Sequence, residues 1–123
     1  MVKLSCLIID EPHISNIISQ KKTWEIRRTA TKKRGLIGLG AKGTLKTKGI
    51  AELTECFLMP VETLCQYQSK HCVTPNFLRD YAKGNEGKQK PLSSLWVYVL
   101  KDAKAIEPRR YTDTTGSWCF VEI

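Results

Sequence analysis

The chain has 123 residues, and its 20 Lys and Arg against 12 Asp and Glu give a formal net charge of +8. The length and the apolar fraction of 41% exclude a disordered chain and are typical of a single domain, which we expect to span 1–123. No apolar run approaches the roughly 20 residues of a membrane-spanning helix. The charge excess predicts an anionic partner, such as nucleic acid, a phosphorylated ligand or a membrane surface, or it serves solubility alone.

The cysteines indicate a reducing environment. Their number, five, is odd, and the short apolar run within 1–9 lacks the pattern of a signal peptide. We therefore expect free thiols, a cytoplasmic location and no membrane association. Cys65, His71 and Cys72 have a spacing that fits no zinc module, so the residues themselves predict neither a metal site nor a cofactor.

The chain begins with a predicted strand and a predicted helix. The apolar stretch 3–9 is a short strand, after which Asp10 and Pro12 are typical of a helix start. The helix ends near 19–20, and residues at helical spacing form its apolar face. These are Ile14, Ile17 and Ile18.

The segment 20–28, QKKTWEIRR, predicts a charged strand, in which alternate residues share a face. One face carries Lys21, Thr23, Glu25 and Arg27, and the other carries Lys22, Trp24, Ile26 and Arg28. Trp24 and Ile26 indicate that the second face meets the core, which leaves Glu25 on a surface or in a cleft. Flanking cations keep such a carboxylate ionised and oriented, as binding or acid/base chemistry requires. The alternative is a solvated edge strand whose charges oppose aggregation.

The basic loop 29–34, TATKKR, predicts contact with nucleic acid. Together with 20–28 it forms the densest positive region of the chain, opposed only by Glu25. Phosphate groups bind to such regions, and Trp24 or Trp118 is a candidate for stacking on a base. The predicted contact residues are Lys21, Lys22, Thr23, Trp24, Glu25, Arg27, Arg28, Lys32, Lys33 and Arg34.

The middle of the chain predicts a hairpin followed by two helices. The glycine-rich stretch 35–41 is a buried strand that pairs with 49–59, and its GLIGLG does not fit the G-x-G-x-x-G nucleotide fingerprint. One helix starts at Pro60 and runs to about 71. The other starts at Thr74 as N-cap and ends at Gly84. Its predicted apolar face consists of Phe77, Leu78 and Tyr81.

The last third predicts three extended segments after a loop at 85–91. The apolar segment 94–100 is the strongest strand and has a central position, and a short piece at 106 is broken by Pro108. A turn at 112–116 leads into a final strand at 117–123. About six strands and a few short helices predict an α+β fold, either a small β-barrel or a curved mixed sheet with helices on its flanks.

The order of these elements resembles the ASCH domain family, which shares a barrel with PUA-type RNA-binding domains. The family hallmark, G-x-K-x-x-E-x-R, is similar to 20–27, with Gln20 at the glycine position and Lys22, Glu25 and Arg27 at the others. The segments Arg34-Gly35 and Gly49-Ile50-Ala51 match further family strands. The resemblance implies a PUA-like small β-barrel that binds RNA or a nucleotide in a cleft beside the hallmark strand.

The resemblance also implies an alternative, a hydrolase. One branch of the family hydrolyses N4-acetylcytidine with a nucleophilic threonine, but this chain has Glu25 at that position. Another member is a metal-assisted ribonuclease that uses the hallmark lysine and a serine of the last strand. The catalytic candidates are therefore Lys22, Glu25 and Ser117, with a divalent metal ion as cofactor only for ribonuclease activity. A third alternative is a protein partner bound through the basic face.

Strict alternation places Lys22 on the face opposite Glu25 and Arg27, although the resemblance gives all three a role. We therefore expect the strand to begin after Lys22, with this lysine at the junction of helix and strand. A lysine acts as a base only where burial or a nearby cation lowers its pKa, and Lys21 or Arg27 is the candidate cation.

Overall fold

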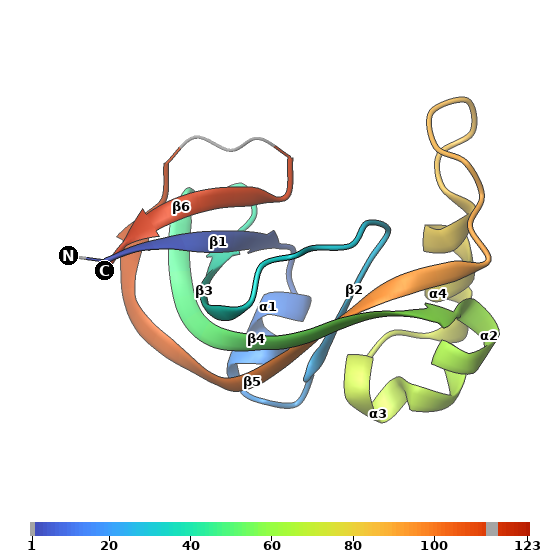
Figure 1. Ribbon diagram of the computed structural model, residues 1–123, viewed down its shortest axis with the longest axis horizontal. Helices are drawn as coiled ribbons and strands as arrows, with labels where there is room; N and C mark the ends of the chain where they lie inside the picture. The colour runs from blue at the N-terminus through green and yellow to red at the C-terminus, as the bar shows by residue number, and fades with distance from the viewer. Residues whose placement is uncertain (1, 113–115) are drawn as a thin grey trace.

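The computed structural model describes residues 2–112 and 116–123, in which six strands and several short helices alternate (Figure 1). The turn predicted at 112–116 falls largely on 113–115, outside the described residues. The elements are β1 (Lys3–Ile9), α1 (His13–Ile18), β2 (Trp24–Arg27), β3 (Gly35–Ala41), β4 (Lys46–Pro60), α2 (Val61–Leu64), the 3-10 helix η1 (Cys65–Tyr67), α3 (Gln68–His71), α4 (Pro75–Lys83), β5 (Ser94–Arg110) and β6 (Trp118–Glu122).

The strands form one mixed sheet in the order β2-β5-β4-β3-β1-β6. The pair β1–β3 is parallel and the other pairs are antiparallel. The predicted α+β class is confirmed, but the predicted closed barrel is wrong, because in the described residues the edge strands β2 and β6 do not pair with each other. Register shifts between β4 and β5 bend these long strands (Figure 1), but the bend does not bring β2 into pairing with β6.

Strand β5 is longer than the sequence predicts. It continues through Pro108 to Arg110, so the predicted break at that proline is wrong. Strand β2 pairs only with the first part of β5, from Trp96 to Val99, so beyond this part β5 has β4 on one side alone. A proline is tolerated in a strand where its missing N–H faces no partner.

Most helices begin where the sequence predicts. In α1, Ile14 and Ile17 are fully buried against the sheet. Thr74 caps α4, because its hydroxyl accepts a hydrogen bond from the Phe77 amide at 3.2 Å, and Pro75 occupies the first turn. The predicted inner face of α4 is only partly right: Leu78 is buried, whereas Phe77 is 51% exposed.

Two apolar clusters position the region between them. The first joins α1 to the sheet through residues such as Leu7, Ile17 and Leu39. The second holds the helical segment 61–83 against β2 and the start of β5, through residues such as Leu78 and Leu95. Strand β2 therefore lies beside the helical segment (Figure 1), and the His13 ring at the start of α1 lies 6.0 Å from the Phe77 ring of α4.

The free thiols expected from the sequence are confirmed. Each of the five cysteines is a free thiol. None of the helices in 2–112 and 116–123 is both long and apolar enough to cross a lipid bilayer.

Candidate functional site

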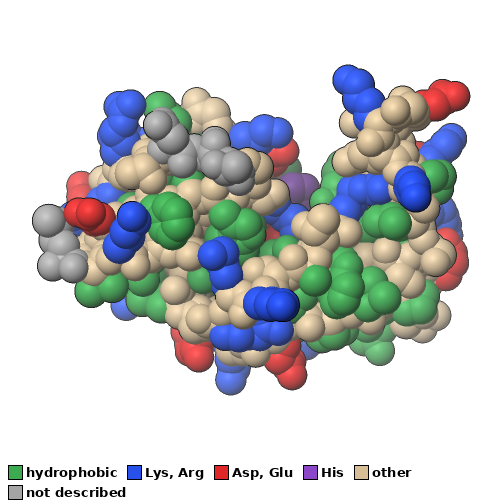
Figure 2. Space-filling model, turned by 45° about the horizontal axis from the view of Figure 1, so that its top comes forward, with side chains coloured by type: hydrophobic (Ala, Val, Ile, Leu, Met, Phe, Trp, Pro, Cys, Tyr) green, Lys and Arg blue, Asp and Glu red, His purple; other side chains and the backbone are tan. Residues whose placement is uncertain are grey.

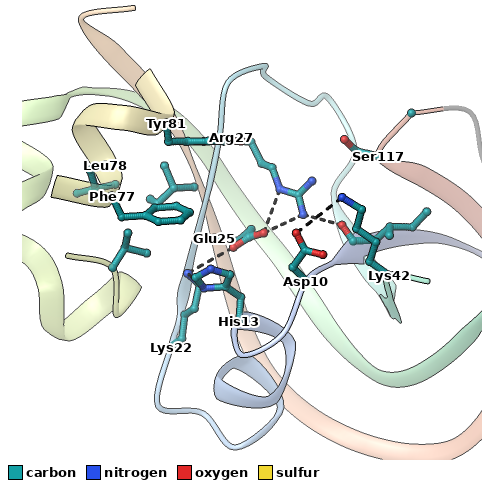
Figure 3. Close-up of a pocket in the computed structure, with 14 residues that line it drawn as sticks. Asp10, His13, Lys22, Glu25, Arg27, Lys42, Phe77, Leu78, Tyr81 and Ser117 are labelled. Carbon is teal, nitrogen blue, oxygen red and sulfur yellow. Dashed lines mark hydrogen bonds and ion pairs between the residues drawn. The ribbon is translucent and has the colours of Figure 1, made fainter. Parts of the chain in front are cut away.

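A cleft of about 220 Å³ opens between the sheet and α4. Figure 2 shows the surface hollowed between the two sides of the molecule, and Figure 3 shows the side chains in this cleft. One wall is apolar and aromatic, and the floor and the opposite wall are charged. The lining residues are Ile8, Asp10, His13, Lys22, Glu25, Ile26, Arg27, Lys42, Val73, Phe77, Leu78, Tyr81, Gly116 and Ser117.

Glu25 is the centre of the charged floor. Glu25 is 5% exposed, and its two carboxylate oxygens face different cations. Oε1 lies 3.4 Å from Lys22 Nζ, and Oε2 accepts hydrogen bonds from Arg27 Nε at 3.0 Å and from Arg27 Nη2 at 2.8 Å. The three side chains therefore form one ion-pair network with two cations and one anion.

Lys22 is the most deeply buried member of this network, with 1% of its surface exposed. Its Nζ donates to the His71 carbonyl at 2.7 Å and lies 3.3 Å from His13 Nδ1, in addition to the contact with Glu25. These three acceptors match the three protons of an ammonium group. Burial lowers the pKa of Lys22, and the negative charge of Glu25 acts against that shift.

The position of Lys22 follows from its place before the strand. Strand β2 starts at Trp24, and the Lys22 amide still bonds to the Asn16 carbonyl of the preceding helix at 2.9 Å. Gln20, with φ of 65°, reverses the chain between α1 and β2. The expected junction position of Lys22 is therefore confirmed, and strict alternation does not apply to it.

Both histidines contact Lys22 and are neutral. His71 donates from Nε2 to the Leu64 carbonyl at 2.6 Å and accepts at Nδ1 from the Val73 amide, which fixes its tautomer. Burial lowers the pKa of His71. Burial and the adjacent Lys22 lower the pKa of His13, whose Nδ1 faces the ammonium and therefore acts as the acceptor.

An aromatic wall stands opposite the charged floor. The Phe77 ring stacks on Tyr81, with centroids 6.2 Å apart and an interplanar angle of 23°, and it lies 6.0 Å from His13. Burial raises the pKa of Tyr81, so its hydroxyl stays protonated at neutral pH. The half-exposed Phe77 offers a ring face to a ligand in the cleft (Figure 3).

The third side of the cleft can hold an anion. Arg27 donates from Nη2 to the Ile8 carbonyl at 2.7 Å as well as to Glu25, and its Nη1 has no hydrogen-bond partner in the described part of the chain. Figure 3 shows Lys42 and Ser117 on this side of Arg27. Lys42 is exposed and lies 3.8 Å from Asp10, a long contact that leaves its ammonium available.

Only part of the predicted contact set lines this cleft. Lys22, Glu25 and Arg27 do, and so does the catalytic candidate Ser117. Figure 3 places Ser117 on the far side of Arg27 from Lys22.

Three other predicted contact residues, Lys21, Thr23 and Trp24, do not line the cleft. Lys21 is exposed, and the Thr23 backbone bonds to Lys70 and Leu100. Trp24 packs edge-on against Phe57, with centroids 5.6 Å apart, as part of the second apolar cluster.

The other predicted contact residues, Arg28 and the cations of the loop 29–34, also lie outside the cleft. Arg28 donates to the carbonyls of Tyr81 and Ala82 and so ties the end of α4 to β2. Lys32 and Arg34 are exposed in the loop between β2 and β3, and Lys33 lies 5.2 Å from the Trp118 ring centroid.

Several residues of the cleft were not among the site residues predicted from the sequence. His13, Phe77, Tyr81 and Lys42 come from three separate segments that only the tertiary fold brings together. Helical periodicity placed Phe77 on the buried face with Leu78, and only the structure shows that its ring is half-exposed.

The cleft does not fit the divalent metal ion that ribonuclease activity would require. Hard cations bind to several free oxygen ligands, but both oxygens of Glu25 already face cations. Within 2–112 and 116–123 there is no group of three or more His, Cys, Asp or Glu side chains arranged to hold a metal ion.

No family model matches the sequence, and no curated protein matches it. The fold is that of the ASCH proteins of known structure. The structure of ASCH from Zymomonas mobilis superimposes with a TM-score of 0.69 and 22% identity, over 85% of this chain and 71% of that one. Two variants of the same protein also match at 23% identity: a Tyr-to-Phe variant with a TM-score of 0.71 over 86% and 74%, and a Ser-to-Ala variant with a TM-score of 0.70 over 86% and 72%. The resemblance inferred from the sequence is thereby confirmed at the level of the fold.

Proposed function

We propose that this chain binds RNA or a nucleotide and holds one base and its phosphate in the cleft between β2 and α4. The observation that supports this function is the half-exposed Phe77 ring opposite the charged floor, because bases stack on aromatic rings. The cleft of about 220 Å³ is smaller than the roughly 300–1,000 Å³ of a drug-sized pocket, so it suits one nucleotide of a strand.

Different residues of the cleft bind the phosphate and the base. The free Nη1 of Arg27 and the ammonium of Lys42 bind phosphate oxygens on the side of Ser117. The base lies against Phe77, where the Tyr81 hydroxyl is a donor for its edge. Lys22 does not contact phosphate, because its three protons already have acceptors, and it holds Glu25 and thereby Arg27 in place.

The test is a titration of the parent protein and a Phe77→Ala variant with a nucleoside monophosphate and with a single-stranded RNA of ten nucleotides. Loss of one stacking contact lowers the affinity for both ligands about 5- to 150-fold. Leu58→Ala is the matched control, because Leu58 is 53% exposed but does not line the cleft. Equal affinities of the parent and Phe77→Ala would exclude this binding mode.

One observation favours a second function, hydrolysis of RNA or of a modified nucleoside such as N4-acetylcytidine. Burial lowers the pKa of Lys22, the direction that a general base requires, and Glu25 lies 3.4 Å away. We propose Lys22 and Glu25 as its acid/base pair. Ser117, across Arg27 from Lys22, is the less favoured participant. Turnover of both substrates by the parent but not by Lys22→Met, under conditions where circular dichroism shows both proteins fully folded, tests this function.

The free thiols also bear on where the protein acts. Because the five cysteines are unpaired, we propose a reducing, cytoplasmic location. Rapid loss of activity in an oxidising compartment would agree with this location.

A further inference from the structure

The outer surface of β6 carries two aromatic rings, each with a lysine over it. Lys33 Nζ lies 5.2 Å from the Trp118 ring centroid, and Lys3 Nζ lies 4.6 Å from that of Phe120. Trp118 is half-buried against the first apolar cluster, whereas Phe120 is 44% exposed. Neither ring is used by the cleft described above.

The two rings share one face of the sheet. Trp118 lies opposite Leu7, and Phe120 lies opposite Ser5, in the antiparallel pair β1–β6. Alternate residues of a strand point to the same side and lie about 7 Å apart. Figure 2 shows hydrophobic and cationic side chains next to each other on the surface over β1 and β6.

This surface is positively charged. Lys32 and Arg34, in the loop that also carries Lys33, are exposed. Within the residues that the structure describes, these three cations and Lys3 form no ion pair. Glu122, opposite Lys3 at the far end of β6, is the acidic residue of the pair β1–β6. One exposed and one half-buried aromatic ring among unpaired cations suit a single strand of nucleic acid better than an acidic protein, because bases stack on the rings while phosphates bind the cations.

The cleft and this surface are neighbours along the chain. Ser117 lines the cleft and directly precedes Trp118. We infer that the surface formed by Lys3, Lys33, Trp118 and Phe120 binds the nucleotides of a single-stranded RNA next to the one held in the cleft. This inference rests on the proposed function, and it identifies the ligand as an RNA strand of several nucleotides rather than a free nucleotide.

The deciding variants are Phe120→Ala, outside the apolar clusters, and the cleft variant Phe77→Ala, with Leu58→Ala as the control for an exposed apolar side chain. Each is titrated with a nucleoside monophosphate and with a ten-nucleotide single-stranded RNA. Phe120→Ala is expected to weaken RNA binding about 5- to 150-fold and to leave the mononucleotide affinity unchanged.

The lysines have a separate readout, the salt dependence of RNA affinity. Changing both Lys3 and Lys33 to Gln is expected to reduce the slope of log K against log salt by about 1.4, because each phosphate contact to a single strand contributes about 0.7. The mononucleotide slope stays the same. This variant leaves both rings in place, so it tests the surface without changing its apolar contacts.

The outcomes separate the two proposals. If Phe77→Ala lowers the affinity for both ligands and Phe120→Ala lowers the affinity for neither, the inference fails and the proposed function stands. If Phe120→Ala weakens RNA and Phe77→Ala does not, the surface binds RNA and the proposed cleft is wrong. If the parent binds neither ligand, both fail. Conversion of a dimer into a monomer by Phe120→Ala, measured by sedimentation, would show a surface for self-association and would also overturn the inference.

Discussion

The charges of the buried network predict that two single substitutions lower the free energy of unfolding by different amounts. Lys22, Glu25 and Arg27 form a set of two cations around one carboxylate. Glu25→Gln keeps the shape of the side chain but leaves the buried Lys22 and the partly buried Arg27 without an anion. Lys22→Met also keeps the shape but leaves a neutral pair of Glu25 and Arg27. We therefore expect Glu25→Gln to destabilise the protein more.

The expected magnitudes follow from what each change leaves behind. Removing one partner of a buried ion pair costs about 3–5 kcal/mol when a charge stays uncompensated, which is the case for Glu25→Gln. In Lys22→Met the main loss is the donor to the His71 carbonyl, at 2.7 Å, and an unsatisfied buried carbonyl costs about 1–3 kcal/mol. Part of this loss is offset because an ammonium group no longer has to be buried.

The assay is urea denaturation of the parent, both single variants and the double variant. A difference of about 2 kcal/mol between the single variants corresponds to about 1 M in the urea midpoint, for a slope of about 2 kcal/mol/M. The double variant should be more stable than Glu25→Gln alone, because removing Lys22 relieves the repulsion between the two cations. Lys21→Met is the control: this exposed lysine is the neighbour of Lys22 and should change the stability by less than about 0.5 kcal/mol.

One result would refute the reasoning. If Lys22→Met costs as much as Glu25→Gln, or if the double variant is the least stable of all, the carboxylate is not the centre of the network. The bond from Lys22 to the His71 carbonyl would then be the main contribution of this lysine.

Other predictions follow from single groups. Because burial lowers the pKa of His71, the unfolded chain binds a proton that the folded chain does not, so the free energy of unfolding should fall as the pH drops below 6.5, by at most about 1.4 kcal/mol per pH unit from this group; a flat profile between pH 6.5 and 5 contradicts this. Arg28→Gln should cost about 1–3 kcal/mol and speed amide exchange at the end of α4, and unchanged exchange there would show that its bonds to Tyr81 and Ala82 are dispensable. The exposed Cys72 should react with a thiol reagent in the folded protein, whereas Cys119, whose pKa burial raises to about 12, should react only on unfolding; early labelling of Cys119, read by mass spectrometry, contradicts the burial.

Elements with local signals could be predicted from the sequence. The Thr74 cap, the proline after it and the alternation of 49–53 act within a few residues, and the structure has α4 and β4 at those places. The barrel could not be predicted, because closure depends on how β4 and β5 bend at their register shifts. These shifts arise from the pairing of residues far apart in the chain, from Glu55 with Val99 to Thr47 with Arg109, and leave no pattern in either segment.

The charged floor was predictable in part. Glu25 and Arg27 are two residues apart in a strand, so their shared face follows from alternation. The contact of Lys22 with His13 depends on the chain reversal at Gln20, and its contact with the His71 carbonyl depends on the fold of the helical segment. Tertiary packing decides such contacts, and no spacing in the sequence reports them.

The aromatic wall and the charged floor of the cleft belong to two different parts of the chain. Pro60 at the end of β4 lies opposite Ser94 at the start of β5, so the segment 61–93 leaves the sheet and returns to it at one paired position. This segment carries the ring of Phe77, whereas Glu25 and Arg27 belong to the sheet. A different segment joined at the same two positions could therefore present another wall to the ligand, as long as it also offers Lys22 a carbonyl in place of that of His71. If the proposed function holds, the choice of base can change by exchange of this segment, and the affinity for phosphate can change by point substitution in the sheet.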